Sequence, residues 1–475
     1  MPTYDSETDH FADECGIFGA YFADADDERR AQLSRIVYYG LYSQQHRGQE
    51  SAGMVLDDGG DFQVHKELGL VAEVFTDEVL DGLRGHAAVG HVRYSTRGAN
   101  SLANAQPLVG QSRLGPLAIA HNGNLVNAPV IRELLEDAGV MFQTSSDSEV
   151  ILNLLARGSR YGLRRALSDT MRTVQGAFSL VILTQEGLVG VRDPNGIRPL
   201  CIGSLDNGYV MASESCSLDA VGAELVRDVE PGEIVIINDE GIQSVKNSER
   251  TALRTCSFEF IYFARPDSTI DGADVYETRR RAGAQLFTEA PVEADLVAGV
   301  PDSGVVAALG YAEASGIPFG MALIKNKYVG RSFIAPSQKL REQAVSVKLN
   351  VLAGNVRGKR VILIDDSIVR GTTSSRLVAM LKEAGATEVH FRVASPPVYF
   401  PCYFGIDTPS RRELAANRGV EDIRDMVGAD SLSFLSVEGL LESLGTQRTF
   451  CTGCFTGVYP VAAPLEEEKM AMEQR

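Results

Sequence analysis

The sequence predicts two domains, an α+β domain followed by an α/β domain with a parallel sheet. At about 150 residues per domain, a chain of 475 residues has room for two or three domains. From residue 15 to about 240, short apolar runs alternate with glycine-rich turns, and segments with helical spacing lie between them. From about residue 290 the order becomes strand, loop, helix, strand, which is the order of βαβ units.

Five apolar segments of the first half have the length and composition of strands. They begin at Cys15, His86, Leu117, Phe178 and Ile234. Apolar residues recur at helical spacing in the segments 33–41 and 150–155, the second after a Ser-Asp-Ser-Glu start. We therefore expect sheets that are covered by separate helices. The expected linker to the second half is formed by Asn238–Gly241 and Lys246–Arg250.

Three strands are predicted in the second half, at Asp295–Val300, Val361–Ile364 and Glu388–Val393. The first two strands run into loops of small and polar residues, and an apolar helix follows each loop. This order predicts a parallel sheet. The charged residues 465–475 are expected to form a helical or frayed tail.

The composition indicates a folded protein with an acidic surface. Hydrophobic residues make up 44%, and no apolar run approaches the ~20 residues of a membrane helix. The first ten residues lack the pattern of a secretory signal, so we expect a cytoplasmic protein without a membrane partner. The net charge of −18 disfavours nonspecific binding to nucleic acid. Only 9 lysines are present, which suggests either a halophilic source or an ordinary acidic enzyme from a GC-rich genome.

Cys15 is the candidate nucleophile of the first domain. A lone cysteine before a strand is more often a buried core residue. Here, however, four further motifs accompany it, namely Gln45-His-Arg-Gly-Gln, Gly90-His-Val-Arg-Tyr-Ser-Thr, His121-Asn-Gly-Asn and Ser145-Ser-Asp-Ser-Glu. Together they supply two arginines, an amide beside a glycine, and a carboxylate.

This set of side chains suits attack on the carboxamide of glutamine. The Cys15 thiolate would form a thioester, while the Asn122 amide and the Gly123 backbone N–H form an oxyanion hole. Arg93 and Asp147 would hold the carboxylate and the amine of the amino acid. No Cys-His pair supplies a base.

Cleavage of residues 1–14 would free the α-amine of Cys15, whose pKa near ~7.7 to 8 suits a base. The five motifs resemble the glutamine amidotransferases that use an N-terminal cysteine nucleophile. This resemblance implies the four-layer αββα sandwich of the N-terminal nucleophile fold and an autoprocessed propeptide of residues 1–14. It also implies that Arg47 binds glutamine together with Arg93 and Asp147.

The segment 361–373 predicts a sugar-phosphate site. Asp365 and Asp366 end an apolar strand, and such a carboxylate pair can bind ribose hydroxyls or Mg²⁺. Donors and a helix N-terminus for a 5′-phosphate follow, from Ser367, Arg370, Gly371, Thr372 and Thr373. A solvated carboxylate pair before a helix cap would explain the threonines but not the whole order.

This segment resembles the phosphoribosyl diphosphate loop of type I phosphoribosyltransferases. The residues 300–304 resemble their pyrophosphate loop, which implies that Asp302 and Ser303 bind the diphosphate and that Ser303 reaches the metal. Between the two loops, residues 325–350 hold 4 of the 9 lysines, including Lys325 and Lys348, and predict a polyanion site. The resemblance implies a flexible loop that closes over the diphosphate. The alternative for its second half is a surface helix.

Seven cysteines in an intracellular chain argue against a disulfide framework. Cys451 and Cys454 form a CxxC motif, which binds metal, performs redox chemistry or does neither. Cys256 and Cys402 would complete a set of four thiolates, and spacing does not distinguish zinc from an iron–sulfur cluster. The other two, Cys201 and Cys216, are expected in the core.

From Cys15 to about Tyr459, the chain resembles the branch of the amidophosphoribosyltransferase family that carries a [4Fe-4S] cluster. The resemblance implies a glutaminase domain at 15–245 and a phosphoribosyltransferase domain at 246–475. It implies that 5-phosphoribosyl diphosphate, glutamine and water give 5-phosphoribosylamine, diphosphate and glutamate, the first step of purine synthesis. It also implies Mg²⁺, the cluster on the four cysteines, a homotetramer and inhibition by purine nucleotides. The motifs at 192–199 and 213–215 are expected to shape the glutaminase domain and its contact with the second domain.

Two other functions fit part of the sequence. Glutamine:fructose-6-phosphate aminotransferases share the first half but lack an acid pair before a phosphate loop, so residues 361–373 argue against them. A nucleotide-sensing regulator on a phosphoribosyltransferase scaffold would have a decayed thiol site and a basic element for DNA. Here the thiol motifs are intact and the net charge is −18.

Overall fold

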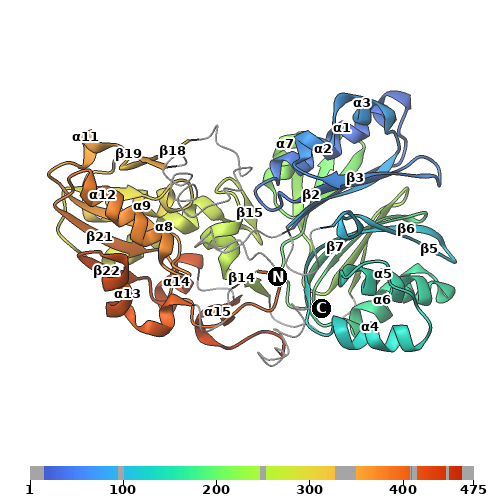
Figure 1. Ribbon diagram of the computed structural model, residues 1–475. Helices are drawn as coiled ribbons and strands as arrows, with labels where there is room; N and C mark the ends of the chain where they lie inside the picture. The colour runs from blue at the N-terminus through green and yellow to red at the C-terminus, as the bar shows by residue number, and fades with distance from the viewer. Residues whose placement is uncertain are drawn as a thin grey trace.

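The computed structural model describes residues 15–94, 101–246, 253–326, 349–406, 408, 414–445 and 449–462. The sheets of the first half lie on one side of the molecule and the elements of the second half lie on the other (Figure 1). Within the described residues, no helix combines the length and the apolar character that a membrane span requires.

Two antiparallel sheets form the centre of the first domain. Their strand orders are β11-β9-β10-β1-β4-β2-β3 and β13-β12-β8-β7-β6-β5. The seven-stranded sheet contains β1 (Gly16–Phe22), β2 (Ser51–Asp57), β3 (Phe62–Leu68), β4 (Ala87–Arg93), β9 (Cys201–Leu205), β10 (Gly208–Ala212) and β11 (Glu224–Asp228). The six-stranded sheet contains β5 (Leu108–Ser112), β6 (Gly115–Leu125), β7 (Gly176–Thr184), β8 (Gly187–Arg192), β12 (Glu233–Asn238) and β13 (Gly241–Lys246).

Successive side chains of a strand point to opposite faces of its sheet, so each sheet packs against helices on one face and against the other sheet on the second. Phe18 and Phe22 of β1 pack against helices, whereas Ile17 and Tyr21 pack against the second sheet. The helices on the seven-stranded sheet are α1 (Asp27–Ser43), α2 (Val71–Val74), α3 (Asp77–Gly82) and α7 (Cys216–Val221). Those on the six-stranded sheet are α4 (Ala128–Asp137), α5 (Ser148–Gly158) and α6 (Leu163–Thr173). The expected αββα sandwich is confirmed.

The expected linker at Asn238–Gly241 is wrong. These residues form the turn of a hairpin in which β12 pairs with β13. The side chains of Ile242 and Val245 on β13 pack against the apolar clusters of this domain, which keeps the strand on the sheet. The remaining part of the expected linker, 247–250, lies outside the described residues.

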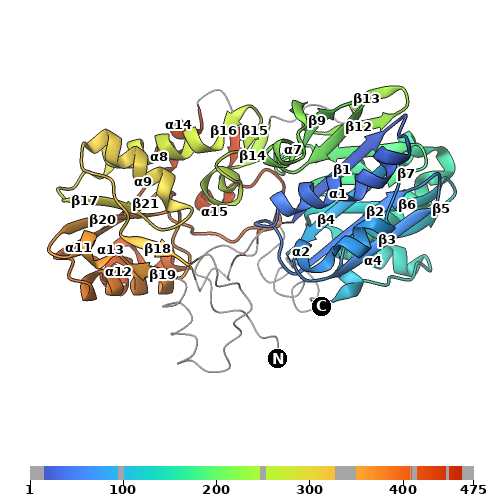
Figure 2. The same cartoon turned by 90° about the horizontal axis from the view of Figure 1, so that it is seen from above.

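A four-stranded parallel sheet of order β17-β20-β21-β22 forms the second domain and confirms the βαβ prediction. Its strands are β17 (Leu296–Gly299), β20 (Arg360–Asp365), β21 (Glu388–Val393) and β22 (Ser431–Phe434). Helices α8 (Val275–Glu289), α9 (Gly304–Ser315) and α14 (Val437–Leu444) cover one face. Helices α12 (Thr372–Glu383) and α13 (Val420–Val427) cover the other, with α11 (Ala353–Val356) nearby (Figure 2).

Short elements join the two domains. They are β14 (Arg254–Cys256), a π-helical turn (Glu259–Phe263), β15 (Thr269–Ile270), β16 (Ala273–Asp274), β23 (Thr449–Cys451) and α15 (Gly453–Thr456). The antiparallel pair of β18 (Leu323–Lys325) and β19 (Leu349–Val351) belongs to the second domain, where it packs on the same apolar cluster as α12. One apolar cluster spans both domains, because Val126, Ala177 and Ile197 of the first pack with Phe258 and Phe404. We call this cluster the shared core.

Candidate active sites

Cys15 lies directly before β1, where strand β4 runs beside it and ends at Arg93. Its Sγ donates to the carbonyl oxygen of Tyr94 over 3.6 Å. Burial raises the pKa of the thiol to about 11. The nearby charge of Arg93 lowers this pKa, and those of Glu50 and Asp147 raise it. The structure therefore brings Cys15, Arg93 and Asp147 together, with a thiol that is protonated at neutral pH.

Asn122 and Gly123 reach this site from β6 of the other sheet. The Nδ2 of Asn122 donates to Ser213 Oγ over 3.4 Å, and the backbone N–H of Ile17 donates to the same oxygen over 3.1 Å. Ser213 thus ties Asn122 to the strand that follows Cys15. Gly123 has a φ of +146°, and a Cβ there would lie 2.0 Å from the carbonyl oxygen of Ala177, so only glycine fits.

Asp147 and Arg47 are both held by the backbone. Asp147 precedes α5, and its Oδ2 accepts a hydrogen bond from the N–H of Leu125 over 2.9 Å. Arg47 is only 1% exposed, and its Nε donates to the carbonyl oxygen of Cys15 over 3.3 Å. Its guanidinium forms ion pairs with Glu214 and Glu259. Arg47 therefore positions the main chain of Cys15.

The acid pair lies at the carboxyl end of β20, beside the loop that follows β17. Ser303 and Ser367 both donate to the Asp366 carboxylate, the second over 2.6 Å. The Asp366 N–H donates to Asp365 Oδ1 over 2.9 Å. A Cβ on Gly304 would lie 2.3 Å from the carbonyl oxygen of Ile364, so this glycine lets the loop approach β20. The two predicted loops thus meet at the sheet edge where α/β domains bind ligands.

The phosphate loop leads into α12. Gly371, with a φ of +86°, is the N-cap residue, and Thr372 and Thr373 form the first turn of the helix. The Nζ of Lys325 pairs with Asp302 Oδ2 over 2.9 Å, which adds Lys325 to this site. Lys348 and residues 327–347 of the basic stretch lie outside the described residues, as do residues 1–14 and the tail at 465–475.

The four predicted ligand cysteines all belong to the shared core or pack against it. Cys256 and Cys451 are paired residues of the parallel strands β14 and β23. Burial raises the pKa of Cys451 to about 12 and that of Cys454 well above its usual value, and the charge of Cys402 raises both. Among the described residues, no three histidine, cysteine or acidic side chains are arranged to hold one metal ion. Cys201 and Cys216 are buried, as expected.

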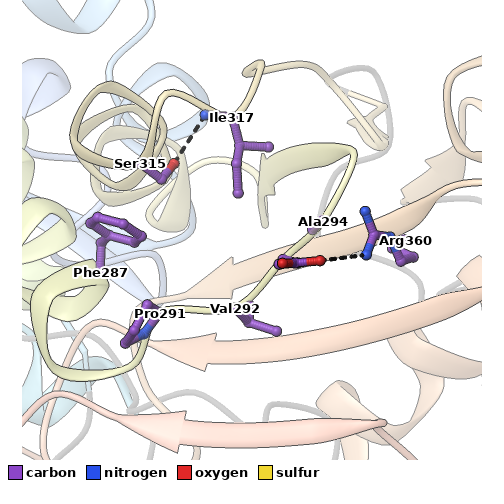
Figure 3. Close-up of a pocket in the computed structure, with 8 residues that line it drawn as sticks. Phe287, Pro291, Val292, Ala294, Ser315, Ile317 and Arg360 are labelled. Atoms are coloured by element: carbon purple, nitrogen blue, oxygen red, sulfur yellow. Dashed lines mark hydrogen bonds and ion pairs between the residues drawn. The ribbon is translucent and has the colours of Figure 1, made fainter.

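A surface hollow of about 480 Å³ lies at the opposite end of the parallel sheet (Figure 3). Phe287, Val292 and Ile317 line it, and Arg360 stands at its edge where β20 begins. Ligands of α/β domains bind at the carboxyl ends of the strands. This hollow is therefore separate from the sugar-phosphate site.

Comparison with known proteins agrees with this division. Residues 91–220 match the glutamine amidotransferase domain family, and residues 273–395 match the phosphoribosyl transferase domain family. Amidophosphoribosyltransferase of Bacillus subtilis is 50% identical over 455 residues, which cover 94% of each chain. That of Archaeoglobus fulgidus is 50% identical over 459 residues, covering 95% of this chain and 99% of its own. The chain belongs to the amidophosphoribosyltransferase family.

Solved structures of this family have the same fold. The Bacillus subtilis glutamine phosphoribosylpyrophosphate amidotransferase, complexed with ADP and GMP, matches with a TM-score of 0.89 and 50% identity. The match covers 95% of this chain and 98% of that chain. Amidophosphoribosyltransferases use the amide nitrogen of glutamine to make phosphoribosylamine, which is the first step of purine synthesis, and this is the enzymatic activity of the chain.

Sequence reasoning missed several residues that hold these amidophosphoribosyltransferase sites in place. Glu259 and Asp271 of the second half pair with arginines of the first half. Gly405 packs on Gly123, since a Cβ on Gly405 would lie 3.2 Å from the Gly123 carbonyl carbon. One signal was present, because Glu259 stands within the aromatic run Phe258-Glu-Phe-Ile-Tyr-Phe. A carboxylate in such a run is buried only with a partner.

Proposed function

We propose that this chain divides the amidophosphoribosyltransferase reaction between the Cys15 site, which releases ammonia from glutamine, and the Asp365–Asp366 site, which adds it to the sugar. The observation that carries the proposal is the position of Cys15 before β1, beside the strand β4 that ends at Arg93, with the charge of Asp147 acting on its thiol from the start of α5. Between the sites, closure of the loop after Lys325 would form a channel that keeps ammonia from water.

In the glutaminase half, Cys15 attacks the amide carbon of glutamine after removal of residues 1–14. The raised pKa of the thiol means that a base has to take its proton, and the freed α-amine is that base. Asn122 and the N–H of Gly123 stabilise the oxyanion. Arg93 and Asp147 bind the carboxylate and the amine of glutamine. Arg47, which the resemblance assigned to glutamine, is instead buried against Glu214 and Glu259 and positions the main chain of Cys15.

In the phosphoribosyltransferase half, Asp365 and Asp366 accept hydrogen bonds from the ribose hydroxyls. The loop before α12 binds the 5′-phosphate through its donors and the positive end of the helix, with Ser367, Arg370, Gly371, Thr372 and Thr373 as its residues. The diphosphate is bound by residues of the pyrophosphate loop and the basic stretch, namely Asp302, Ser303, Lys325 and Lys348.

Mg²⁺ is the metal that phosphoribosyltransferases typically use. The donor set fits it, because Asp365, Asp366 and Ser303 offer hard oxygen atoms and a hydrogen bond joins Ser303 to Asp366. Mg²⁺ usually keeps several waters and binds through one or two carboxylates plus substrate oxygens, so no closed protein cage is needed. When bound, it would neutralise charge on the departing diphosphate.

A [4Fe-4S] cluster is proposed on Cys256, Cys402, Cys451 and Cys454, with a structural and oxygen-sensing role. All four are free thiols that gather around one apolar core, so the donor chemistry fits the cluster. Tetrahedral zinc, with Zn–S bonds of about 2.3 Å, would draw its sulfurs within about 3.8 Å of one another. In a cluster each thiolate binds a different iron, so the four sulfurs do not have to converge on one point.

Metal analysis of protein purified without oxygen tests this proposal. We expect equal amounts of iron and acid-labile sulfide, and we expect Cys454→Ser to lower both while Cys201→Ser leaves both unchanged. Stoichiometric zinc without sulfide would contradict the cluster.

Regulation and assembly are proposed from the family. The Bacillus subtilis relative was solved with ADP and GMP, which supports purine nucleotides as inhibitors of this chain. We also propose a cytoplasmic homotetramer, and a division of the chain near residue 246, where β13 ends.

The decisive experiment compares two nitrogen sources in processed protein. Cys15→Ala should abolish phosphoribosylamine synthesis from glutamine and leave synthesis from ammonia within about twofold, because only the thioester step needs the thiol. Asp366→Asn should lower both. Cys201→Ala is the matched control, a buried cysteine of the same domain that should keep both activities. Loss of both activities in folded Cys15→Ala would contradict the two-site proposal.

A further inference from the structure

A buried ion network connects the two domains behind the thiol site. Its members are Arg47, Arg198, Glu214 and Glu259, whose side chains are all 0% exposed. Arg47 donates through one amino group to both oxygens of Glu259, over 2.7 and 2.9 Å. Its other amino group donates to Glu214 and, over 3.0 Å, to Glu259. The Nε of Arg47 donates to the carbonyl oxygen of Cys15 over 3.3 Å.

Glu259 comes from the second half of the chain and is held there firmly. It begins the π-helical turn, and its aromatic neighbours Phe258 and Phe260 are buried in the shared core. Arg279 of α8 donates to three carbonyl oxygens of this segment, those of Phe260, Tyr262 and Ala264, over 2.7, 3.0 and 2.8 Å. The turn therefore presents Glu259 to Arg47 from a fixed position.

The charges leave Arg47 little freedom to adopt another position. A buried guanidinium that loses its carboxylate partner carries a large desolvation cost. Two oxygens of Glu259 fix the plane of the guanidinium, because a bidentate pair sets orientation as well as distance. Since the same plane directs Nε at Cys15, the orientation of Glu259 determines where the main chain of Cys15 lies.

We propose that Glu259 is a positioning residue for the glutaminase reaction, which acts through Arg47 to place Cys15 for attack. The proposal rests on the assignment of Cys15 as the nucleophile. It means that the thiol site is complete only when the second domain supplies its carboxylate. Glutamine itself is bound elsewhere, by Arg93 and Asp147, so the effect belongs to the chemical step and not to substrate binding.

The chain offers a matched control in a second buried ion pair between the domains. Asp271 accepts from both amino groups of Arg192, over 2.7 and 2.9 Å, and side-chain exposures are 0% for Arg192 and 7% for Asp271. Neither residue is bonded to Cys15 or Arg47 among the interactions described. Arg192 meets the network only at the main chain, where its Nε donates to the carbonyl oxygen of Arg198 over 2.8 Å. Asp271→Asn therefore weakens the domain contact while both carboxylates that hold Arg47 stay in place.

The experiment measures kcat and KM for glutamate release, ammonia-dependent synthesis and thermal unfolding in processed protein. For Glu259→Gln we expect a loss of about 100-fold in kcat, the size expected for a displacement of about 1 Å. We expect KM to stay within about threefold and ammonia-dependent synthesis within about twofold. Asp271→Asn should lower the unfolding temperature by about as much as Glu259→Gln does, while its kcat stays within about threefold of the unsubstituted protein.

An equal loss of kcat in Asp271→Asn would overturn the proposal, and so would an unchanged kcat in Glu259→Gln. If Glu259→Gln does not fold, Glu259→Asp provides the test, because it keeps the negative charge and shortens the side chain by one methylene. It should lower kcat by about tenfold, and an unchanged kcat would again overturn the proposal. Glutaminase activity in Cys15→Ala would instead contradict the proposed nucleophile.

Discussion

With residues 1–14 attached, the Cys15 thiol should be a poor nucleophile at neutral pH. Burial is the main cause that raises its pKa to about 11, and Arg93 offsets only part of this effect. At pH 8 such a thiol holds about a hundredth of the thiolate of an ordinary cysteine with a pKa near 9. Activity therefore depends on a base, which processing would create at the same residue.

Processing should change the pH dependence of Cys15. In unprocessed chain, alkylation of Cys15 by iodoacetamide should keep rising up to about pH 11, because the thiolate forms only near the raised pKa. In processed chain, kcat/KM for glutamate release should rise with a midpoint near the α-amine pKa of about 7.7 to 8, since the amine accepts a proton only once it is neutral. Cys15→Ala gives the background rate of alkylation. A midpoint near 11 in the processed chain would contradict the role of the amine.

Helices α8 and α9 show how an element sets the position of a loop. A Cβ on Gly283 would lie 1.8 Å from the carbonyl oxygen of Ala307, and one on Gly310 would lie 1.8 Å from that of Arg280. The two backbones therefore cross with no room for a methyl group. Because Ser303 is the N-cap residue of α9, a shift of this helix would also move Ser303 relative to the acid pair.

Gly310→Ala should force the two helices apart. We expect a loss of about 3 kcal/mol in the free energy of unfolding, at the upper end for overpacking, and a higher KM for phosphoribosyl diphosphate. Gly354→Ala on α11 is the control, because no atom lies within 4 Å of its added Cβ. It should be neutral or stabilise by about 0.5 kcal/mol. Urea unfolding measures both, and equal stabilities would contradict the close crossing.

The charge of the whole molecule predicts its response to salt. A net charge of −18 destabilises the folded chain through self-repulsion, and salt screens that repulsion. The unfolding temperature should therefore rise with added KCl. Screening is nearly complete at about 1 M, where the Debye length is about 3 Å.

Unfolding curves from 0.1 to 3 M KCl would separate the two origins of the acidic composition. A rise that stops by about 1 M indicates an ordinary acidic enzyme, whereas a rise that continues to 3 M indicates halophilic adaptation. Sodium sulfate at equal ionic strength is the control, because it also strengthens apolar burial. A falling unfolding temperature in KCl would contradict repulsion as the dominant charge effect.

Motifs indicate candidate site residues, because strand ends and glycine-bearing turns leave a local pattern. Cys15 stands where an apolar run begins, whereas Asn122 and the acid pair stand where apolar runs stop. Contacts between distant segments leave no such pattern. The pair of Arg47 and Glu259 joins residues 212 positions apart, and neither residue's neighbours indicate its partner.

The linker was misplaced for a related reason. The polar residues Asn238–Gly241 suit a hairpin turn and a linker equally well. Only the packing of β13 against the sheet decides between them, and that packing depends on contacts with residues far away in the chain. The short β14 and β23 were equally hidden, since they pair with each other across almost 200 residues of the chain.

The shared core should make the two halves of the gene evolve together. If a gene encoded the first half alone, Val126, Ala177 and Ile197 would be exposed to water. If it encoded the second half alone, Phe258 and Phe404 would be exposed. Recombination that replaced one half with that of a distant relative would have to preserve both apolar faces and the charges beside them. Substitutions on the two sides of this contact should therefore be correlated among descendants of the gene, although the two reactions are chemically independent.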